Sequence, residues 1–550
     1  MDETFTNTSL DDFVIKDKDY RLNKLKKNIK IFVIIISILV VIGGLTYFII
    51  KILTKTYGEI TCIYQTYKDN ETIELINLDY ENMEFYLKIG LEKFEQKNKH
   101  TFKNAGNHTV TFVFKKKLNS LNNLFKEKFS LIEADLSQLE ADEITSLQRV
   151  FFDCINLKKV KFDFEESNQI VDMSNLFHNC SSLEKVLFNL NTEKVADMRG
   201  LFEYCTSLTS VDISGFNTNN LEYIDFMFSG CKNLISIDIS NFNLEQVTDM
   251  SYTFQNCSRL EHIKFPKSYT NKLIFLNGMF IDCKSIQKLD LDFFVTKNVE
   301  NMRYMFSGCS ELKDLNLSNF QTYNTLDIDG MFSLCLSLRE INLNNFDFSN
   351  VMSVDKLFNG CSNLEKIDIS SIYSPILINM SSTFMNCTNL KEVRLPPKLY
   401  GIQYLISAFE NCINLEYIDL SSFNGNEDIF GTEKMFKNCT SLKKIDFPKI
   451  EAEHLKSMSE MFYDCINLEY INIGDFLTDS IINMNEMFYN CKSLDYLNIS
   501  KFSTTNLKNV SRIFIGVNSS VKLIYPKNIS QNLKDEICDL KNIPKENCLL

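Results

Sequence analysis

The chain has 550 residues and a formal net charge of −13, with 45 phenylalanines, 17 cysteines and no tryptophan. This length exceeds that of one ordinary domain and predicts either several domains or a repeat array. An acidic chain without a basic stripe interleaved with aromatic residues is not expected to bind nucleic acid.

Residues 31–50 form a segment that has to be interpreted in terms of a membrane. These twenty residues carry no charge, and as a helix they rise about 30 Å, roughly the hydrocarbon thickness of a bilayer. Few basic residues follow the segment, whereas five precede it: Arg21, Lys24, Lys26, Lys27 and Lys30. The positive-inside rule therefore predicts a cytoplasmic tail at 1–30, a signal anchor at 31–52 and an extracellular C-terminal bulk. A cleaved signal peptide is the alternative, which the oversized apolar region and the missing small-x-small cleavage site disfavour.

Residues 59–117 show the alternation of apolar and polar residues that is typical of strands, as in TIELINLDY and NHTVTFVFKKKL. The stretch HTFKNAGNHTVTFVF, from His100 to Phe114, is similar to the final hairpin of PKD-like or immunoglobulin-like extracellular modules. A small β-domain next to the membrane is therefore expected, with an irregular N-terminal cap as the alternative. Sequons such as those that begin at Asn107, Asn256 and Asn438 would face a glycosylating compartment in a eukaryote.

Residues 118–525 contain a repeat of about 26 residues that a cysteine marks. Fourteen cysteines recur at gaps of 25, 26 or 27 residues: Cys154, Cys180, Cys205, Cys231, Cys257, Cys283, Cys309, Cys335, Cys361, Cys387, Cys412, Cys439, Cys465 and Cys491. A phenylalanine stands three residues before each and extends the pattern to sixteen copies, from Phe125 to Phe514. The end copies carry Lys128 and Val517 in place of cysteine, as expected of terminal units that face water. Such a period predicts a solenoid.

Within each unit the spacing of apolar residues changes. In the unit around Cys309 the first half is spaced as one face of a short helix, with Met302, Met305, Phe306 and Cys309. The second half alternates as in a strand, with Leu312, Leu315 and Leu317. The residue before the cysteine is Gly, Asn or Asp in twelve of fourteen copies, and these residues tolerate the left-handed conformation that ends a helix.

This spacing predicts that the cysteines pack in the core rather than act as catalytic residues or metal ligands. Cys309 shares the inward side of its unit with Phe306, and a buried thiol packs well there. Metal binding requires clustered ligands, and the chain has one cysteine per repeat and five histidines in all. Disulfides between stacked neighbours are the remaining alternative, because parallel strands lie about 4.8 Å apart. A serine in place of Cys309 is expected to bury a hydroxyl without a partner.

The unit MF-x-x-C-x-x-L-x-x-L-D-L-S-x-F, at Met305–Phe320 and Met227–Phe242, resembles the BspA-like leucine-rich repeats of bacterial and protist surface proteins. The predicted fold is an α/β leucine-rich-repeat solenoid of about 16 repeats with a parallel sheet on its concave face. The resemblance implies a right-handed solenoid with a surface-exposed binding or adhesive role and no enzyme activity. The fit is loose at Cys387–Tyr404 and Phe423–Glu433, where local irregularity is expected.

Residues 526–550 are expected to cap the C-terminal end of the solenoid. Cys538 and Cys548 lie ten residues apart in this cap, and outside the cell they are predicted to form a disulfide. Cys62 is then left without a partner.

Candidate ligand-binding residues lie at outward positions of the last strands. The position seven after the cysteine is Asp or Asn in ten copies, which predicts either cation binding or a hydrogen-bonded polar column. The position five after it becomes Tyr or Lys near the C-terminal end, and aromatic area beside polar groups is typical of sugar and protein sites. The candidates are Tyr417, Asp419, Lys444, Asp446, Tyr470, Asn472, Tyr496 and Asn498. Tyr470 and Tyr496 are expected within stacking distance; the alternative is that tyrosine merely suits a strand surface.

The predicted function is that of a single-pass cell-surface protein whose extracellular solenoid binds a protein, glycan or matrix ligand. A self-associating surface-coat protein is the alternative. No catalytic residue, metal site or cofactor is predicted, because the sequence contains no GxGxxG, Walker, HExxH or GxSxG motif.

Overall fold

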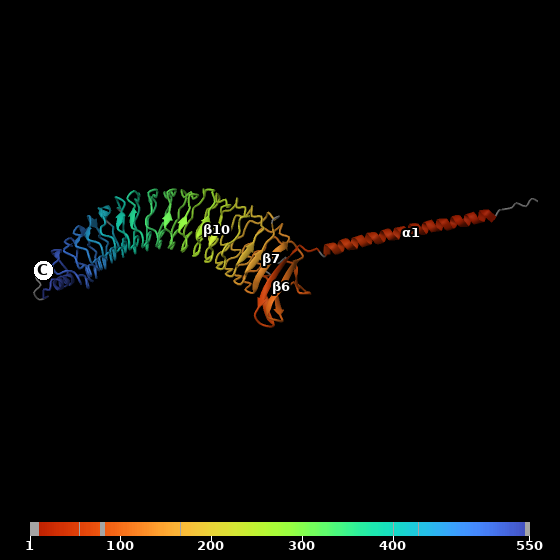
Figure 1. The fold of residues 1–550 in the computed structure, drawn as a ribbon, viewed down its shortest axis with the longest axis horizontal. Coiled ribbons are helices and arrows are strands. Elements are labelled where there is room, and N and C mark those ends of the chain that lie inside the picture. The colour runs from red at the N-terminus through yellow and green to blue at the C-terminus, as the bar shows by residue number, and fades with distance from the viewer. Residues whose placement is uncertain are drawn as a thin grey trace, which may run out of the picture.

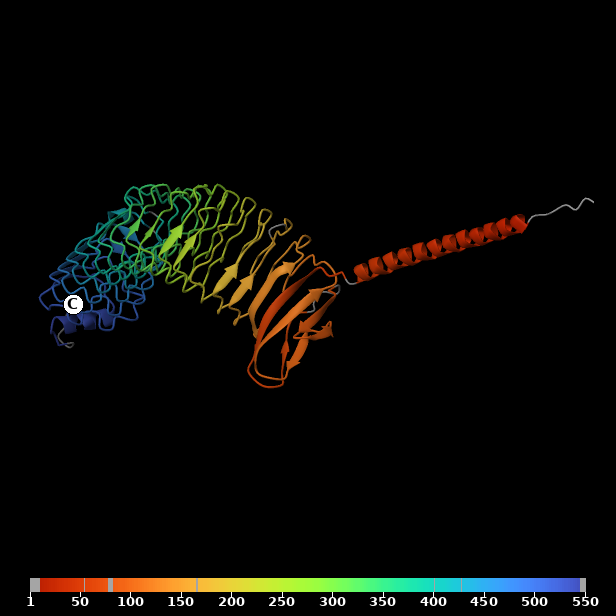
Figure 2. The ribbon, with the colours of Figure 1, turned by 45° about the vertical axis from the view of Figure 1, so that its right-hand side comes forward.

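The computed structural model describes residues 10–53, 55–77, 83–164, 167–399, 401–426 and 428–544. Helix α1 (Leu10–Leu53) projects from one end of a long, curved solenoid, and a group of longer strands lies where the two meet (Figure 1). The solenoid has about 15 turns of about 26 residues, as predicted. Its coils stack along the arc, and the C-terminal end lies at the tip far from α1 (Figure 2).

Helix α1 contains the apolar segment. The stretch Tyr20–Lys51 is long and apolar enough to cross a membrane, and its side chains are exposed. Signal anchors and signal peptides both have such a helix. The helix includes the basic segment before the apolar one without a break, so the five basic residues lie on the same continuous helix.

The strands after α1 form two sheets. The strands are β1 (Gly58–Thr66), β2 (Glu71–Glu74), β3 (Phe85–Ile89), β4 (Glu92–Glu95), β5 (Lys99–Phe102), β6 (Gly106–Phe114), β7 (Leu131–Leu139), β8 (Lys159–Lys161) and β9 (Lys185–Leu187). β2 pairs with β5, and the other seven form one sheet in the order β4-β3-β6-β1-β7-β8-β9. β1 is antiparallel to β7, whereas β7 is parallel to β8. The sheet of the first coils therefore continues directly into the N-terminal strands.

The hairpin that His100–Phe114 resembles is not formed. β5 pairs with β2, whereas β6 pairs with β1 and β3. The chain crosses between the two sheets after β5, and two hydrogen bonds join this crossing to the turn at Asp69 and Asn70. The Asp69 carboxylate accepts the N–H of Ala105 at 2.9 Å, and the carbonyl of Lys103 accepts the N–H of Asn70 at 3.1 Å.

The remaining strands are short and belong to the coils. They are β10 (Ser236–Asp238), β11 (His262–Lys264), β12 (Lys288–Leu289), β13 (Asp314–Leu315), β14 (Lys366–Asp368), β15 (Glu392–Arg394), β16 (Lys444–Asp446), β17 (Ile450–Glu451), β18 (Tyr470–Asn472), β19 (Phe476–Leu477), β20 (Tyr496–Asn498) and β21 (Lys522–Ile524). Their pairs are parallel, and each residue faces its equivalent in the next coil. Within the loosely fitting Phe423–Glu433 stretch the coil is irregular: the 3-10 helix η1 (Ser421–Phe423) leads into it, and an isolated antiparallel bridge joins Asp428 to Ala452.

The segment before each cysteine forms consecutive turns, so the predicted short helix is wrong. The N–H of Cys309 donates to the carbonyl of Phe306, three residues back, at 3.1 Å. The N–H of Phe306 donates instead to the carbonyl of Met331 in the next coil, at 2.9 Å. Positive φ angles at Tyr304 (54°) and Gly308 (75°) produce this alternation. Since the next coil satisfies the N–H groups that a helix would use internally, stacking favours turns over a helix.

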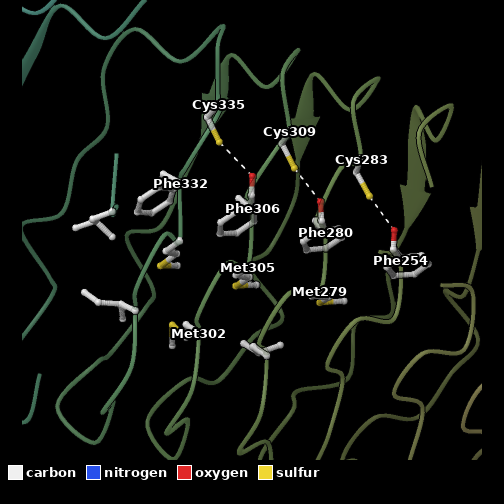
Figure 3. Packing of buried hydrophobic residues seen from close by; sticks show 14 of the residues in the cluster. Phe254, Met279, Phe280, Cys283, Met302, Met305, Phe306, Cys309, Phe332 and Cys335 are labelled. Atoms are coloured by element: carbon white, nitrogen blue, oxygen red, sulfur yellow. Dashed lines mark hydrogen bonds between the residues drawn. The ribbon is translucent and has the colours of Figure 1, made fainter. Parts of the chain in front are cut away.

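The phenylalanines form one stack that runs the length of the solenoid. All sixteen rings from Phe125 to Phe514 are stacked with an offset, with neighbouring centroids 5.3–5.9 Å apart and planes within 15°. Figure 3 shows four of them, from Phe254 to Phe332. Leu312 and Leu317 are buried beside this phenylalanine stack, and Leu315 is partly buried.

The column cysteines are free, buried thiols that link successive coils. Each Sγ donates to the carbonyl oxygen of the phenylalanine one coil earlier, at 2.9–3.2 Å. For Cys309 the acceptor is Phe280, at 3.2 Å (Figure 3). Burial raises the pKa of these thiols, to about 12 for Cys361. The structure thus supports packing over a disulfide column, and it supplies the partner that a serine at position 309 was expected to lack.

Both ends of the solenoid are covered. At the first coil Lys128 stands in the cysteine position, and its buried ammonium donates to Asn77 and to the carbonyl of Lys126. At the last coil helix α2 (Gln531–Leu540) buries Leu533, Ile537 and Cys538. The predicted disulfide stays a prediction, because Cys548 lies outside the described residues.

Replacing Cys309 by alanine is expected to lower the free energy of unfolding by about 1–2 kcal/mol, because packing atoms and the bond to Phe280 are both lost. Cys309→Ser is expected to cost less, about 1 kcal/mol or below, because the hydroxyl can donate to the same carbonyl. Denaturant midpoints of the full chain in detergent measure both, with Ser318→Ala, at an exposed position of the same coil, as control. A serine variant less stable than the alanine variant would show that the hydroxyl does not reach Phe280.

Candidate functional site

The candidate residues lie on the exposed strand face of the last coils. β16, β18, β20 and β21 form a four-stranded parallel sheet. The position-five residues face one another in the order Lys444, Tyr470, Tyr496 and Lys522, and the position-seven residues in the order Asp446, Asn472 and Asn498. Six of the eight candidates are therefore brought together in two adjacent rows.

Tyr470 and Tyr496 form a stacked aromatic pair whose outer faces are covered by lysines. Their ring centroids are 4.7 Å apart and their planes differ by 6°. The Lys444 ammonium lies 5.0 Å from the Tyr470 centroid, and the Lys522 ammonium 5.7 Å from that of Tyr496. We call these four side chains the tyrosine–lysine pile. Because the pile covers the ring faces, only ring edges and hydroxyls remain for a ligand.

The second row is a hydrogen-bonded polar column. The amide of Asn498 donates to Asn472 Oδ1 at 3.0 Å, and that of Asn472 donates to Asp446 Oδ1 at 2.9 Å. The Asp446 carboxylate also forms an ion pair with the Lys444 ammonium, with 3.6 Å between Oδ2 and Nζ. This is the geometry of the polar-column alternative that the sequence left open beside cation binding.

In most coils this position also closes a local turn. Its side-chain oxygen accepts the backbone N–H two residues on, as Asp238 does from Ser240 at 2.9 Å. Hydrogen bonds from Ser240 lower the pKa of Asp238 to about 2. Asp446 departs from the pattern, because Pro448 has no N–H to donate. Among the described residues no group of three or more His, Cys, Asp or Glu is placed to hold a metal ion.

Tyr417 and Asp419 lie one coil earlier, outside this four-stranded sheet. Tyr417 is 61% exposed and has no ring contact within the described ranges. The Asp419 carboxylate accepts the N–H of Ser421, the first residue of η1, at 2.9 Å. These two candidates therefore lie in the coil next to the other six but outside their sheet.

A second tyrosine pair, which the sequence reasoning missed, lies on the turn face of the same coils. Tyr463 and Tyr489 stack with centroids 4.6 Å apart. Lys437 and Arg512 cover the two ends at 4.8 Å each. These tyrosines stand two residues before successive cysteines, so the column comparison that found Tyr470 and Tyr496 would have found them too.

Asp225, on the turn face of a central coil, is a strongly perturbed carboxylate. Its Oδ1 is buried and accepts no hydrogen bond among the described residues. Burial and then the neighbouring Asp249 raise its pKa to about 7, against the opposing charge of Arg199. Nothing nearby gives this group a chemical step to perform, so its consequence is for stability.

Family models recognise the repeat. The BspA type leucine-rich repeat region matches residues 87–199, 354–495 and 407–535, together more than half of the chain. A model described as Mycoplasma protein of unknown function, DUF285, matches residues 156–265 and 274–395. The chain therefore belongs to the BspA-type leucine-rich repeat family. No curated protein matches it.

Solved structures with leucine-rich repeats are similar at low identity. A leucine-rich repeat protein from Eubacterium ventriosum is 16% identical over 54% of this chain and 80% of its own, with a TM-score of 0.27. A chain of the Toll–Spatzle complex of Drosophila is 16% identical over 68% of this chain, with a TM-score of 0.23, and the match spans 43% of that chain. A chain of the TLR13–ssRNA13 complex is 15% identical over 74% of this chain and 65% of its own, with a TM-score of 0.23.

Asp225→Asn is expected to change how stability depends on pH. With a raised pKa of about 7, the folded chain holds a proton on Asp225 that the unfolded chain releases near pH 4. The free energy of unfolding therefore falls as pH rises from about 4 to about 7. The variant should be more stable than the native chain by about 1 kcal/mol at neutral pH, a figure reduced for partial exposure, and equal to it near pH 4. Denaturation midpoints across this range, with the exposed Asp495→Asn as control, measure the effect; identical pH profiles would contradict it.

Proposed function

We propose that the protein is a single-pass surface protein whose extracellular solenoid binds a protein, glycan or matrix ligand. The observation that carries the proposal is the pairing of an exposed apolar helix with a solenoid whose core residues are all committed to packing. The five basic residues before the apolar segment support a cytoplasmic N-terminus. BspA-type repeat proteins are commonly surface and recognition proteins, which supports the same function.

The covered ends disfavour end-to-end stacking of the solenoid into a self-associating coat. End-to-end assembly of solenoids requires open terminal coils that can pair with another chain. Here β1 covers the sheet edge of the first coil, and Lys541 of the C-terminal cap donates to the carbonyls of Ser519 and Val521 at 2.7 and 2.6 Å. The long lateral faces are what remains for an interaction.

Within those faces we place a ligand contact at the tyrosine–lysine pile and the polar column beside it. The rings are covered on both faces, so the contact uses phenol hydroxyls, ring edges and the two ammonium groups. Such a surface suits hydrogen bonding to a protein or a glycan more than stacking of a sugar on a ring. Tyr417 extends the surface by one coil with a freely exposed ring.

Protease treatment of intact cells that express the full chain tests the topology. An N-in, C-out protein should lose its C-terminal bulk, while residues 1–30 remain protected. In a eukaryotic host Asn107→Gln should remove a glycan, because Asn107 is exposed in its sequon. Loss of a glycan in Asn438→Gln would support the same orientation, because this sequon also follows the apolar segment. Protection of the bulk together with digestion of residues 1–30 would reverse the assignment.

Replacing Tyr470 and Tyr496 together by serine tests the contact surface. Binding of the full chain in nanodiscs to arrays of glycans and matrix proteins should weaken at least tenfold, about 1.4 kcal/mol. The matched control is the double replacement of Tyr463 and Tyr489, which removes an equivalent stacked pair from the turn face. Both variants should lose similar stability, about 1 kcal/mol, but only the first should lose binding. Equal binding by the two variants would move the contact elsewhere.

A further inference from the structure

A groove of about 700 Å³ crosses five successive coils in the middle of the arc. We call it the central groove. One wall is a row of residues nine before the cysteine: Thr248, Ile274, Glu300 and Leu326. The other wall is a row of amides eleven before it: Asn298, Asn324 and Asn350. None of these residues belongs to the tyrosine–lysine pile or to its coils.

Backbone hydrogen bonds fix the first row. The N–H groups of Ile274, Glu300 and Leu326 each donate to the carbonyl of the preceding member of the row, at 2.9, 2.9 and 2.8 Å. The side chains therefore project from neighbouring coils about 4.8 Å apart. Leu326 is 56% exposed, and Met352 continues the row at 53%. These two side chains are neighbours in the row and leave apolar area exposed at one end of the central groove.

The amide row is held with its oxygens available. Asn298, Asn324 and Asn350 donate through Nδ2 to carbonyls of the preceding coil, at 3.1, 2.8 and 2.6 Å. In the part of the chain that the structure describes, their Oδ1 atoms accept no hydrogen bond. A ligand with N–H donors along its length can use these acceptors.

An exposed carboxylate in the central groove favours a ligand that carries a cationic group. The exposed Glu300 carboxylate lies between Ile274 and Leu326 and has no ion pair within the described ranges. Lys272, also in the lining, donates to the side-chain amide of Gln246 at 2.5 Å and forms no ion pair with Glu300 among the described residues. A cation beside an apolar group complements this arrangement.

We propose that the central groove binds a polypeptide segment of a partner protein that carries a basic side chain next to an apolar one. The basic group pairs with Glu300, the apolar group packs on Leu326, and backbone N–H groups donate to the amide row. A polypeptide is favoured over a glycan because none of the groove-lining residues is aromatic, and ring faces are what sugar sites commonly use. The inference rests on the proposed recognition function but uses a surface separate from the tyrosine–lysine pile.

Labelled dodecapeptides of alternating Lys and Leu provide the probe, with Glu–Leu and Lys–Ser dodecapeptides and a neutral linear hexasaccharide as comparisons. The full chain in zwitterionic nanodiscs should bind the Lys–Leu peptide at least tenfold more tightly than the other three after subtraction of empty nanodiscs. Glu300→Lys should reverse the preference between the Lys–Leu and Glu–Leu peptides. Leu326→Ser should weaken Lys–Leu binding at least fivefold, whereas Val171→Ser, an exposed residue at the same position of a distant coil, should change it less than twofold.

Equal affinity for the three peptides, or affinities that neither Glu300→Lys nor Leu326→Ser alters, would overturn the proposal. Binding of the hexasaccharide that Leu326→Ser abolishes would reassign the central groove to carbohydrate. The Tyr470 and Tyr496 double variant separates this inference from the proposed function. It should retain peptide binding, and if it loses neither peptide nor array binding, only the contact at the tyrosine–lysine pile fails.

Discussion

The register of the phenylalanine stack is the constraint on which the rest of the solenoid depends. Each ring must meet its neighbour at 5.3–5.9 Å, and each cysteine must reach the carbonyl of the phenylalanine one coil back. Both contacts survive where the period changes. Phe177 and Phe202 are 25 residues apart and Phe409 and Phe436 are 27 apart, yet their centroids lie at 5.5 and 5.4 Å. The missing or extra residue is therefore absorbed in loops away from the stack, as in the irregular coil after η1.

The buried half of each coil was predictable because its residue types repeat with the packing. The sequence assigned Phe306, Cys309, Leu312, Leu315 and Leu317 to the core; four of them are buried and Leu315 is partly buried. It misassigned the turns as a helix, because both structures place the same spaced residues on one side. The feature that separates them is a second positive φ in each coil, five residues before the cysteine. Glycine occupies that position in three coils, but most coils carry residues such as Tyr304 and Lys356, which give no sign of a left-handed backbone.

The sequence predicted which residues of the candidate site lie close together, but not how their side chains are arranged. Equivalent positions in adjacent repeats brought Tyr470 and Tyr496 together, but the cover that Lys444 and Lys522 place on their faces depends on side-chain conformations. The Asp and Asn column had a readable signal, because Ser often follows two residues later and supplies the N–H of a turn. The central groove had none, since it forms only where loops of five coils line up.

The tyrosine–lysine pile and the central groove differ in how many of their side chains already have partners within the solenoid. In a stacked array, identical neighbours satisfy one another: tyrosine covers tyrosine, and asparagine donates to asparagine. A row that changes from coil to coil cannot do this, because Ile274, Glu300 and Leu326 have no complementary contact to make with each other. Their exposed area and charge stay available along the solenoid. In this fold, the positions that depart from the repeat are therefore the ones whose exposed area and charge contribute most to binding a partner.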